Sequence, residues 1–546
     1  MESIVAKFRQ HILVLRFIWK DSCRFILTGR RIIIMRKILQ FITAITSLTV
    51  IILSLSCTSQ RRETINIPVP PQLVPDYSNI TIPYNIAPLN FRIKDKGVSY
   101  LAKLTSQNGL VLEKSSRNGK IIFPIKKWRN FLKNCHGGFY TIEIFVKEKH
   151  KNIWKKYTPI TNYVSSCPID EHIVYRFIPT IHRLWALIEI YDRDITTFNS
   201  RCIIDNENFG RDGCINCHSF LKNSPDTMSI HIRSRRFGPP MLIGRNNTIK
   251  AYDLRTSDHP SPAAYHSWHL SGRFIALSKN KLSPFEHSAG ETADVWDENS
   301  DLFIYDLEHE SFLNTPQIAK PDRRETWPSW SADGQWLYFC SALQIPFEQF
   351  QNVRYDLMRV RFDPTNNTLG EPETLLAAET CGMSASHPRE SPDGAWLFFT
   401  LAPYGNFPIY KNDADIYMLN LKTKEITKPL INSDACDSWF CWSSNGRWLA
   451  FASKRGNGLM ARIYFSFFDN NGNFSKPFVL PQENPDFYES CTMTYNVPEL
   501  ITGPIRYSAL SFRNAICSKI RRKPTTGAVQ KEGESDSSIW RPSENR

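Results

Sequence analysis

Four segments in the second half of the chain share one pattern of apolar and polar positions. Each has a polar turn containing a glycine, followed by a run of aromatic and aliphatic residues; the glycines are Gly272, Gly334, Gly394 and Gly446. Asp-Gly and Asn-Gly favour tight hairpin turns because both central positions tolerate positive φ. The apolar run after each turn is typical of a strand buried between sheets. The pattern therefore predicts four similar β-hairpins.

A second shared strand follows each hairpin, at residues 301–307, 356–362, 415–421 and 462–468. One unit of four strands then recurs roughly every 50–60 residues without helices, which predicts the blades of a β-propeller. The recurring Trp-Ser-x-Asp-Gly-x-Trp-Leu-x-Phe pattern resembles the WD-like repeats of TolB-type propellers. This resemblance covers residues 261–513 and implies the fold; proteins with that fold have many functions.

Less regular strand pairs precede these four repeats. Residues 228–233 and 248–254 predict one more blade, and residues 172–178 and 185–192 another. We expect an all-β chain: a propeller of six or seven blades over residues 166–513, closed by a strand at 506–512. A small β-sandwich-like domain at 85–165 precedes it, since strand runs such as 140–146 occur there.

The N-terminal region has the pattern of an export signal. Residues 35–56 combine a short basic start at Met35 with an apolar stretch of small and aliphatic residues that ends directly before Cys57. Cys57 resembles the acylated cysteine of bacterial lipoproteins, although Ser54 departs from the usual pattern. An uncleaved signal anchor is the alternative. We expect translation to begin at Met35, with residues 1–34 a mis-annotated extension, a lipid anchor on Cys57, a flexible tether at 57–84 and a location in the periplasm or at the outer membrane.

The net charge of +14 comes mainly from the two ends of the chain. A nucleic-acid-binding surface requires the basic residues on the folded domain, so we expect no nucleic-acid partner. The charged tail at 514–546 is expected to be disordered.

Cys214, Cys217 and His218 form the sequence Cys-x-x-Cys-His, the attachment signature of c-type haem. Two thiols one helical turn apart reach both porphyrin vinyl groups, and the histidine lies under the iron as a metal ligand. The motif is predicted to lie in a loop at 206–225. Exported TolB-like lipoproteins with a similar insertion resemble this chain, which adds little about function.

Other interpretations of the motif stay open. Cys214 and Cys217 are also spaced for a redox-active or structural disulfide, and with His218 for zinc, although a second Cys-x-x-Cys is absent from the sequence. If haem is bound, Met228 or His231 would supply the sixth iron ligand. Alternatively, Met228 belongs to the core and His231 forms a hydrogen bond with a loop carbonyl group.

The sequence gives no hydrolase elbow, nucleotide-binding loop or metalloprotease motif, so an enzyme is the third choice. The first is a membrane-anchored propeller with one covalent c-type haem, used for electron transfer or redox sensing with an envelope partner. The second is a haem-free propeller that binds protein or glycan at the cell envelope.

Overall fold

The computed structural model of the chain describes residues 63–149, 153–179, 187–208, 213–257, 259–285 and 294–525. Cys57, residues 1–34, the apolar segment 35–56 and the tail beyond residue 525 lie outside these residues. In the described part, no helix has the length and apolar character needed to span a bilayer.

Residues 64–165 form two sheets and a helix. The larger sheet contains β1 (Thr64–Ile67), β3 (Thr81–Pro83), β5 (Ser99–Ser106), β6 (Val111–Ser116), β8 (Gly138–Lys147), β9 (Trp154–Tyr157) and β10 (Ile160–Ser165). The smaller sheet contains β2 (Leu73–Val74), β4 (Phe91–Ile93) and β7 (Lys120–Ile121). Helix α3 (Ile125–Cys135) buries Trp128, Phe131, Leu132 and Cys135 in the shared core.

This domain begins earlier than the sequence predicted. Residues 64–83, expected to belong to a flexible tether, supply three of its strands, and Ile80 and Ile82 are fully buried. The prediction of a flexible tether was wrong for residues 64–83. Their strands are short and Pro-rich, so apolar and polar positions hardly alternate along them.

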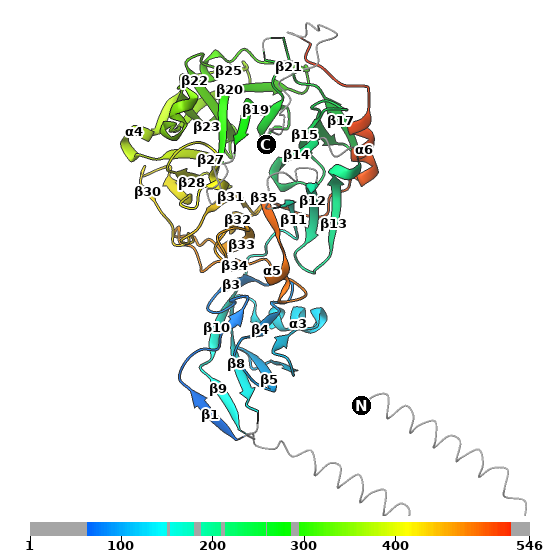
Figure 1. Cartoon of the computed structure of the whole chain (residues 1–546), viewed down its shortest axis with the longest axis vertical. Coiled ribbons are helices and arrows are strands. Elements are labelled where there is room, and N and C mark those ends of the chain that lie inside the picture. The colour runs from blue at the N-terminus through cyan, green and yellow to red at the C-terminus, as the bar shows by residue number, and fades with distance from the viewer. Residues whose placement is uncertain are drawn as a thin grey trace, which may run out of the picture. The chain divides into compact units, whose positions relative to one another are not determined.

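Among the described residues, six sheets of four or five strands follow and surround one axis, and they form a six-bladed β-propeller (Figure 1). Blade one contains β35 (Met493–Ile501), β11 (His172–Pro179), β12 (Glu189–Asp194) and β13 (Ser200–Asp205), in that order from the axis outward. Blade two contains β14 (Gly213–Phe220), β15 (Met228–Ser234), β16 (Met241–Arg245) and β17 (Thr248–Tyr252). Blade three contains β18 (Ala263–Trp268), β19 (Phe274–Phe285), β20 (Asp294–Asp306) and β21 (Ser311–Phe312).

The remaining blades continue the same order. Blade four contains β22 (Arg323–Trp330), β23 (Trp336–Leu343), β24 (Asp356–Asp363), β25 (Thr368–Leu369) and β26 (Glu373–Leu376). Blade five contains β27 (Ser384–Glu390), β28 (Trp396–Ala402), β29 (Asp415–Asn420) and β30 (Ile426–Thr427). Blade six contains β31 (Asp437–Trp442), β32 (Trp448–Ser453), β33 (Arg462–Phe467) and β34 (Phe478–Val479).

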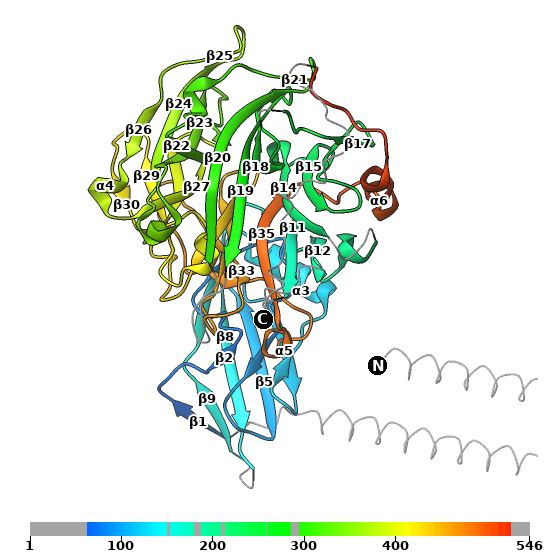
Figure 2. The same cartoon turned by 45° about the horizontal axis from the view of Figure 1, so that its top comes forward.

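The ring is closed by β35, which is the innermost strand of blade one and pairs antiparallel with β11 (Figure 2). The sequence placed this closing strand at 506–512, and that was wrong. Residues 509–517 instead form helix α6 (Ala509–Cys517), which packs Phe512 and Ile516 into the core of blades one and two. The tail is ordered further than expected, since Arg521 donates to the carbonyl oxygen of Phe237 (2.6 Å).

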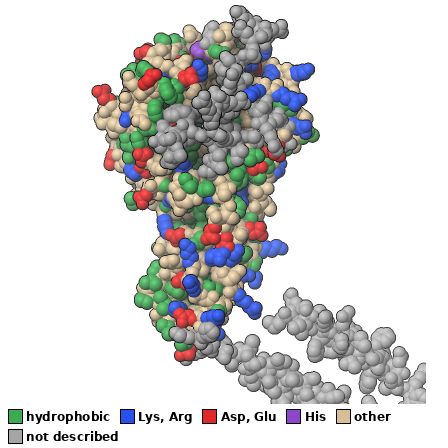
Figure 3. Space-filling view, in the orientation of Figure 1, with side chains coloured by type: hydrophobic (Ala, Val, Ile, Leu, Met, Phe, Trp, Pro, Cys, Tyr) green, Lys and Arg blue, Asp and Glu red, His purple; other side chains and the backbone are tan. Residues whose placement is uncertain are grey.

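The four Gly-containing turns lie where the sequence predicted, between the first and second strands of blades three to six. Gly272, Gly334, Gly394 and Gly446 all have φ near +70°, which only glycine adopts without strain. Basic and acidic side chains are interspersed over the described part of the face in Figure 3.

Candidate functional site

The Cys-x-x-Cys-His motif lies in β14, the innermost strand of blade two, and not in a loop as predicted. The pairing of β14 with β15 shifts register between Ile215 and His218, so the strand bulges at this point. Because the bulge breaks the two-residue alternation of side chains, the sequence around it does not have the usual strand pattern.

The two thiols of the motif belong to different packing clusters. Cys214 packs against the core between blades one and two, which contains Ile188 and Ile215. Cys217 packs against the cluster at the axis, which contains Tyr265 and Trp439. Covalent haem attachment needs both thiols at one porphyrin edge, and this strand does not present them that way.

His218 is enclosed between blades one and two. Its side chain is 2% exposed, its Nε2 lies 3.4 Å from the carbonyl oxygen of Val174, and its ring meets Phe220 edge-on. Burial lowers the pKa of His218 to about 3, so the ring is neutral. The backbone of β11 thus occupies the side of the imidazole where a haem iron would bind, and the described residues do not fit a c-type haem.

The proposed sixth ligands lie on opposite faces of β15. Met228 is fully buried in the core shared with blade one. His231 is also fully buried, but it lies on the face that carries Ser229, which accepts a hydrogen bond from Trp268 of blade three (2.9 Å). Neither nitrogen of His231 has a hydrogen-bond partner among the described residues, so the carbonyl bond expected for it is not formed there.

The described residues around His218 do not form a metal site either. Among the described residues, no group of three or more His, Cys, Asp and Glu side chains is arranged to hold a metal ion. Cys217 is a free thiol.

The innermost strand of every blade bulges at the same level, and the bulged residues form what we call the axial ring. Its members are Cys217, Tyr265, Trp327, His387, Trp439 and Val497, from blades two to six and then one. The aromatic members meet at the axis: Trp327 lies 4.9 Å from Trp439 and 5.2 Å from His387, centroid to centroid. Side chains therefore fill the centre of the propeller.

Four ring residues have a backbone conformation that bulky side chains rarely adopt. Trp327, His387, Trp439 and Val497 have φ between +48° and +57°. A β-branched or bulky residue there costs on the order of 1–3 kcal/mol, and such residues cluster at functional sites. In the four clear repeats the ring residue lies seven positions before the turn glycine, a regularity that would have located the ring from sequence.

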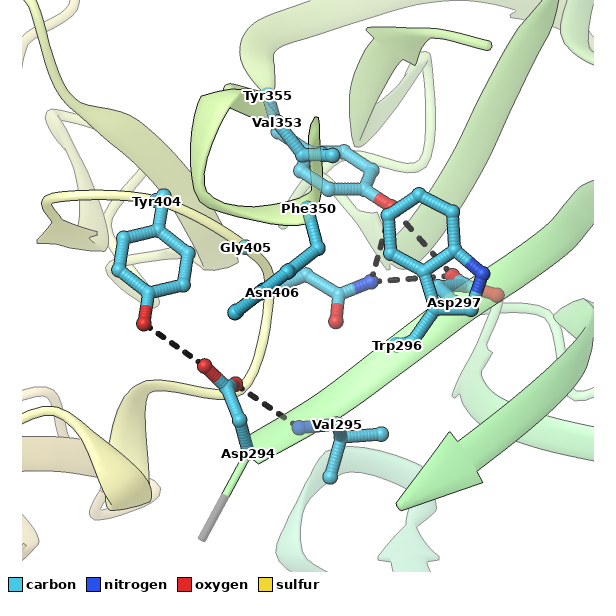
Figure 4. Close-up of a pocket in the computed structure, with 10 residues that line it drawn as sticks. All are labelled: Asp294, Val295, Trp296, Asp297, Phe350, Val353, Tyr355, Tyr404, Gly405 and Asn406. Carbon is cyan, nitrogen blue, oxygen red and sulfur yellow. Dashed lines mark hydrogen bonds between the residues drawn. The ribbon is translucent and has the colours of Figure 1, made fainter. Parts of the chain in front are cut away.

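A polar recess lies beside the ring, formed by the start of β20 in blade three and by the segments that connect the second and third strands of blades four and five (Figure 4). We define this polar recess by its lining: Asp294, Val295, Trp296, Asp297, Phe350, Val353, Tyr355, Tyr404, Gly405 and Asn406. Trp327 donates its indole N–H to the carbonyl oxygen of Asn406 (3.1 Å), which joins the axial ring to the recess.

Asp294 forms a buried ion pair at one end of the recess. Lys411 Nζ lies 2.5 Å from its Oδ2, and Tyr404 donates its hydroxyl to the same oxygen (2.9 Å). The ammonium also lies over the Tyr404 ring, 3.4 Å from its centroid. These contacts fix the carboxylate and the phenol relative to one another.

Asp297 occupies the other end of the recess. Its Oδ2 accepts from Asn280 (2.7 Å) and Asn406 (3.1 Å). Burial raises the pKa of Asp297 to about 7, against the opposing effect of these hydrogen bonds. Asp297, Asn280 and Asn406 each have a buried Oδ1 without a hydrogen-bond partner among the described residues. The small enclosed space of the recess can admit a single hydroxyl group or water, which would satisfy the oxygens of Asp297 and Asn406.

Aromatic rings complete the recess. Trp296 is buried under the Arg324 guanidinium, 4.4 Å from the ring centroid, and Phe350 and Tyr404 are half-buried. None of these residues was predicted from the sequence, because they come from three separate segments with no shared motif.

No family model matches the chain, and a search of curated proteins finds no match. TolB from Acinetobacter baumannii is similar in structure, with 13% identity, a TM-score of 0.37 and coverage of 66% of this chain and 79% of that one. A chain of the nidogen/laminin complex shows 8% identity and a TM-score of 0.36, covering 61% and 98%. The Swd1 propeller domain from Myceliophteria thermophila shows 13% identity and a TM-score of 0.29, covering 47% and 66%.

Proposed function

We propose that this chain is an exported, haem-free β-propeller that binds a glycan in the polar recess. The observation that carries the proposal is the combination of aromatic rings with buried, unsatisfied acceptor oxygens on Asp297 and Asn406. A sugar offers hydroxyl donors to such oxygens and an apolar C–H face to aromatic rings.

Export and anchoring at Cys57 are part of the same proposal, and rest on the signal-like segment at 35–56. Acylation would attach the propeller to the cell envelope, where glycans are abundant. Electron transfer through haem is not part of the proposal, since His218 is enclosed by the β11 backbone.

The test is binding of a panel of neutral and acidic oligosaccharides to the chain from Cys57 onward with Cys57→Ser, measured by isothermal titration calorimetry. We expect Asp297→Asn to weaken binding about tenfold or more. Asn280 and Asn406 both donate to Oδ2, so the new amide nitrogen would take the Oδ1 position and turn an acceptor into a donor. Phe350→Ala should also weaken binding, through loss of ring contact.

Asp413→Asn is the matched control, because Asp413 is exposed and lies in the same β28–β29 connection as Asn406. It should bind as the unchanged protein does. Folded protein that binds no member of the panel, or that binds equally well with Asp297→Asn and Phe350→Ala, would contradict the proposal.

A further inference from the structure

Two arginines on the face that carries the polar recess have no counter-charge within the part of the chain that the structure describes. Arg176 lies near the end of β11 and Arg233 near the end of β15, where each strand runs into the connection to the third strand of its blade. Neither side chain forms an ion pair or hydrogen bond with any residue in the described ranges, and the Nε of each is buried without a partner. A buried guanidinium donor left unpaired is costly, which indicates that a group outside the described residues completes it.

The strand register places both arginines beside the axis. Arg176 lies opposite Asn496 in β35, next to the ring residue Val497. It shares its side of β11 with Val174 and Ile178, which pack toward blade two. Arg233 lies opposite Cys214 in β14. The inner strand of blade two therefore runs between the two arginines.

The axial ring has its smallest side chains on this side. Blades three, four and six contribute the large buried rings of Tyr265, Trp327 and Trp439. Blades one and two contribute only Val497 and Cys217, and the Cys217 side chain is half-buried. The smallest members of the axial ring therefore come from the same two blades as the two guanidinium groups.

Electrostatic effects join the arginines to the ring and to the recess. Burial raises the pKa of Cys217, while the charges of Arg176 and Arg233 oppose that rise. Both arginines and the Asp297 carboxyl also act on the pKa of Tyr265, which burial raises far more strongly. Tyr265 is therefore within electrostatic range of both arginines and of the Asp297 carboxyl.

We propose that Arg176 and Arg233 bind the anionic group of an acidic sugar residue whose neighbour occupies the polar recess. This inference rests on the proposed function and narrows it to glycans that carry carboxylate or sulfate. Arginine suits this role because its planar fork matches both groups with paired N–H donors. The acceptor oxygens of the recess would bind hydroxyl groups of the adjoining sugar.

The experiment compares three oligosaccharide sets of equal length with the same chain: neutral, uronic acid and sulfated. We expect an acidic set to bind at least tenfold tighter than the neutral set, with an affinity that falls as salt rises, because salt screens the charges. Arg176→Gln and Arg233→Gln should each reduce acidic binding about tenfold or more and leave neutral binding nearly unchanged. Arg176→Lys should retain part of the affinity, because it keeps the charge but not the fork.

Arg235→Gln is the matched control, since Arg235 follows β15 directly and is exposed. It should leave all affinities unchanged, and circular dichroism would show that each variant is folded. Neutral and acidic sets that bind equally, or acidic binding unaffected by folded Arg176→Gln and Arg233→Gln, would overturn this inference and leave the proposed function standing. Binding of no glycan would overturn both. The difference between the uronic acid and sulfated sets identifies the anionic group.

Discussion

Tyr265 and Trp327 stack face to face across the boundary between blades three and four, with ring centroids 3.6 Å apart and planes inclined by 16°. Both rings are buried, and Trp439 lies edge-on to Trp327. Among the aromatic pairs of the described axial ring, this one has the shortest centroid distance, and it joins neighbouring blades at the axis.

Removal of the stack should destabilise the propeller. Trp327→Ala is expected to lower the free energy of unfolding by about 3–5 kcal/mol, because it removes a buried ring and leaves a cavity. Trp327→Phe should cost less, since a ring remains to stack. Urea denaturation followed by circular dichroism measures both changes. Leu430→Ala serves as the control, because Leu430 is 96% exposed and should change stability by less than about 0.5 kcal/mol. Equal midpoints for Trp327→Ala and the unchanged chain would contradict this account of the ring.

The buried pair Asp294 and Lys411 should show strong coupling. Lys411→Met is expected to destabilise the chain by about 3–5 kcal/mol because it leaves a carboxylate buried without its counter-charge. The double variant Asp294→Asn with Lys411→Met should recover much of that loss. A double-mutant cycle from denaturation curves gives the coupling energy. The exposed pair Lys476 and Asp76 provides a comparison, for which we expect at most about 1 kcal/mol. If the two cycles gave similar values, the pair in the recess would not be buried in solution.

Asp297 should make stability fall as pH rises from acid to neutral. Its pKa is raised in the folded chain to about 7 from 3.8, so between these values the folded state binds more protons than the unfolded state. The free energy of unfolding then decreases as pH increases through this window and levels off above it. Asp297→Asn removes the dependence, and its stability relative to the unchanged chain should grow across the window by a few kcal/mol at most. Denaturation at a series of pH values measures the difference between the two proteins, which cancels the contributions of other groups. A difference that stays constant with pH would show that Asp297 is ionised normally.

The chain should carry no covalent haem. When it is exported alongside a cytochrome c maturation system, a pyridine haemochrome spectrum is expected to show no haem band, since Cys214 and Cys217 pack in different clusters and His218 is enclosed. Cys214→Ala and Cys217→Ala should give the same spectrum. A haem band that disappears in these variants would show that β14 rearranges on maturation, and electron transfer would again be the leading function.

The repeat pattern predicted the propeller well, because turn glycines such as Gly334 and the apolar strands after them are local signals. The closing strand was missed for a local reason as well. Residues 493–501 contain Asn496, Pro498 and Glu499, which are atypical of a buried central strand. In the structure the bulge of β35 falls at this point, with Val497 in the axial ring.

The candidate site could not be predicted in the same way. Its carboxylates, amides and rings come from segments more than a hundred residues apart, such as Asp297 and Asn406, and only blade packing brings them together. The one recognisable motif, Cys-x-x-Cys-His, suggested a haem site instead. The sequence spacing of Cys214, Cys217 and His218 is the same in a helix and in a bulged strand, but the directions of their side chains differ.

The filled axis also limits how a long polymer can use this molecule. With Tyr265, Trp327 and Trp439 packed together at the centre, a strand of polysaccharide cannot thread through the propeller and emerge on the far side. A glycan bound as proposed would have to enter and leave on the same face of the propeller. Such binding would suit a chain end or a short branch, and not movement along a continuous polymer.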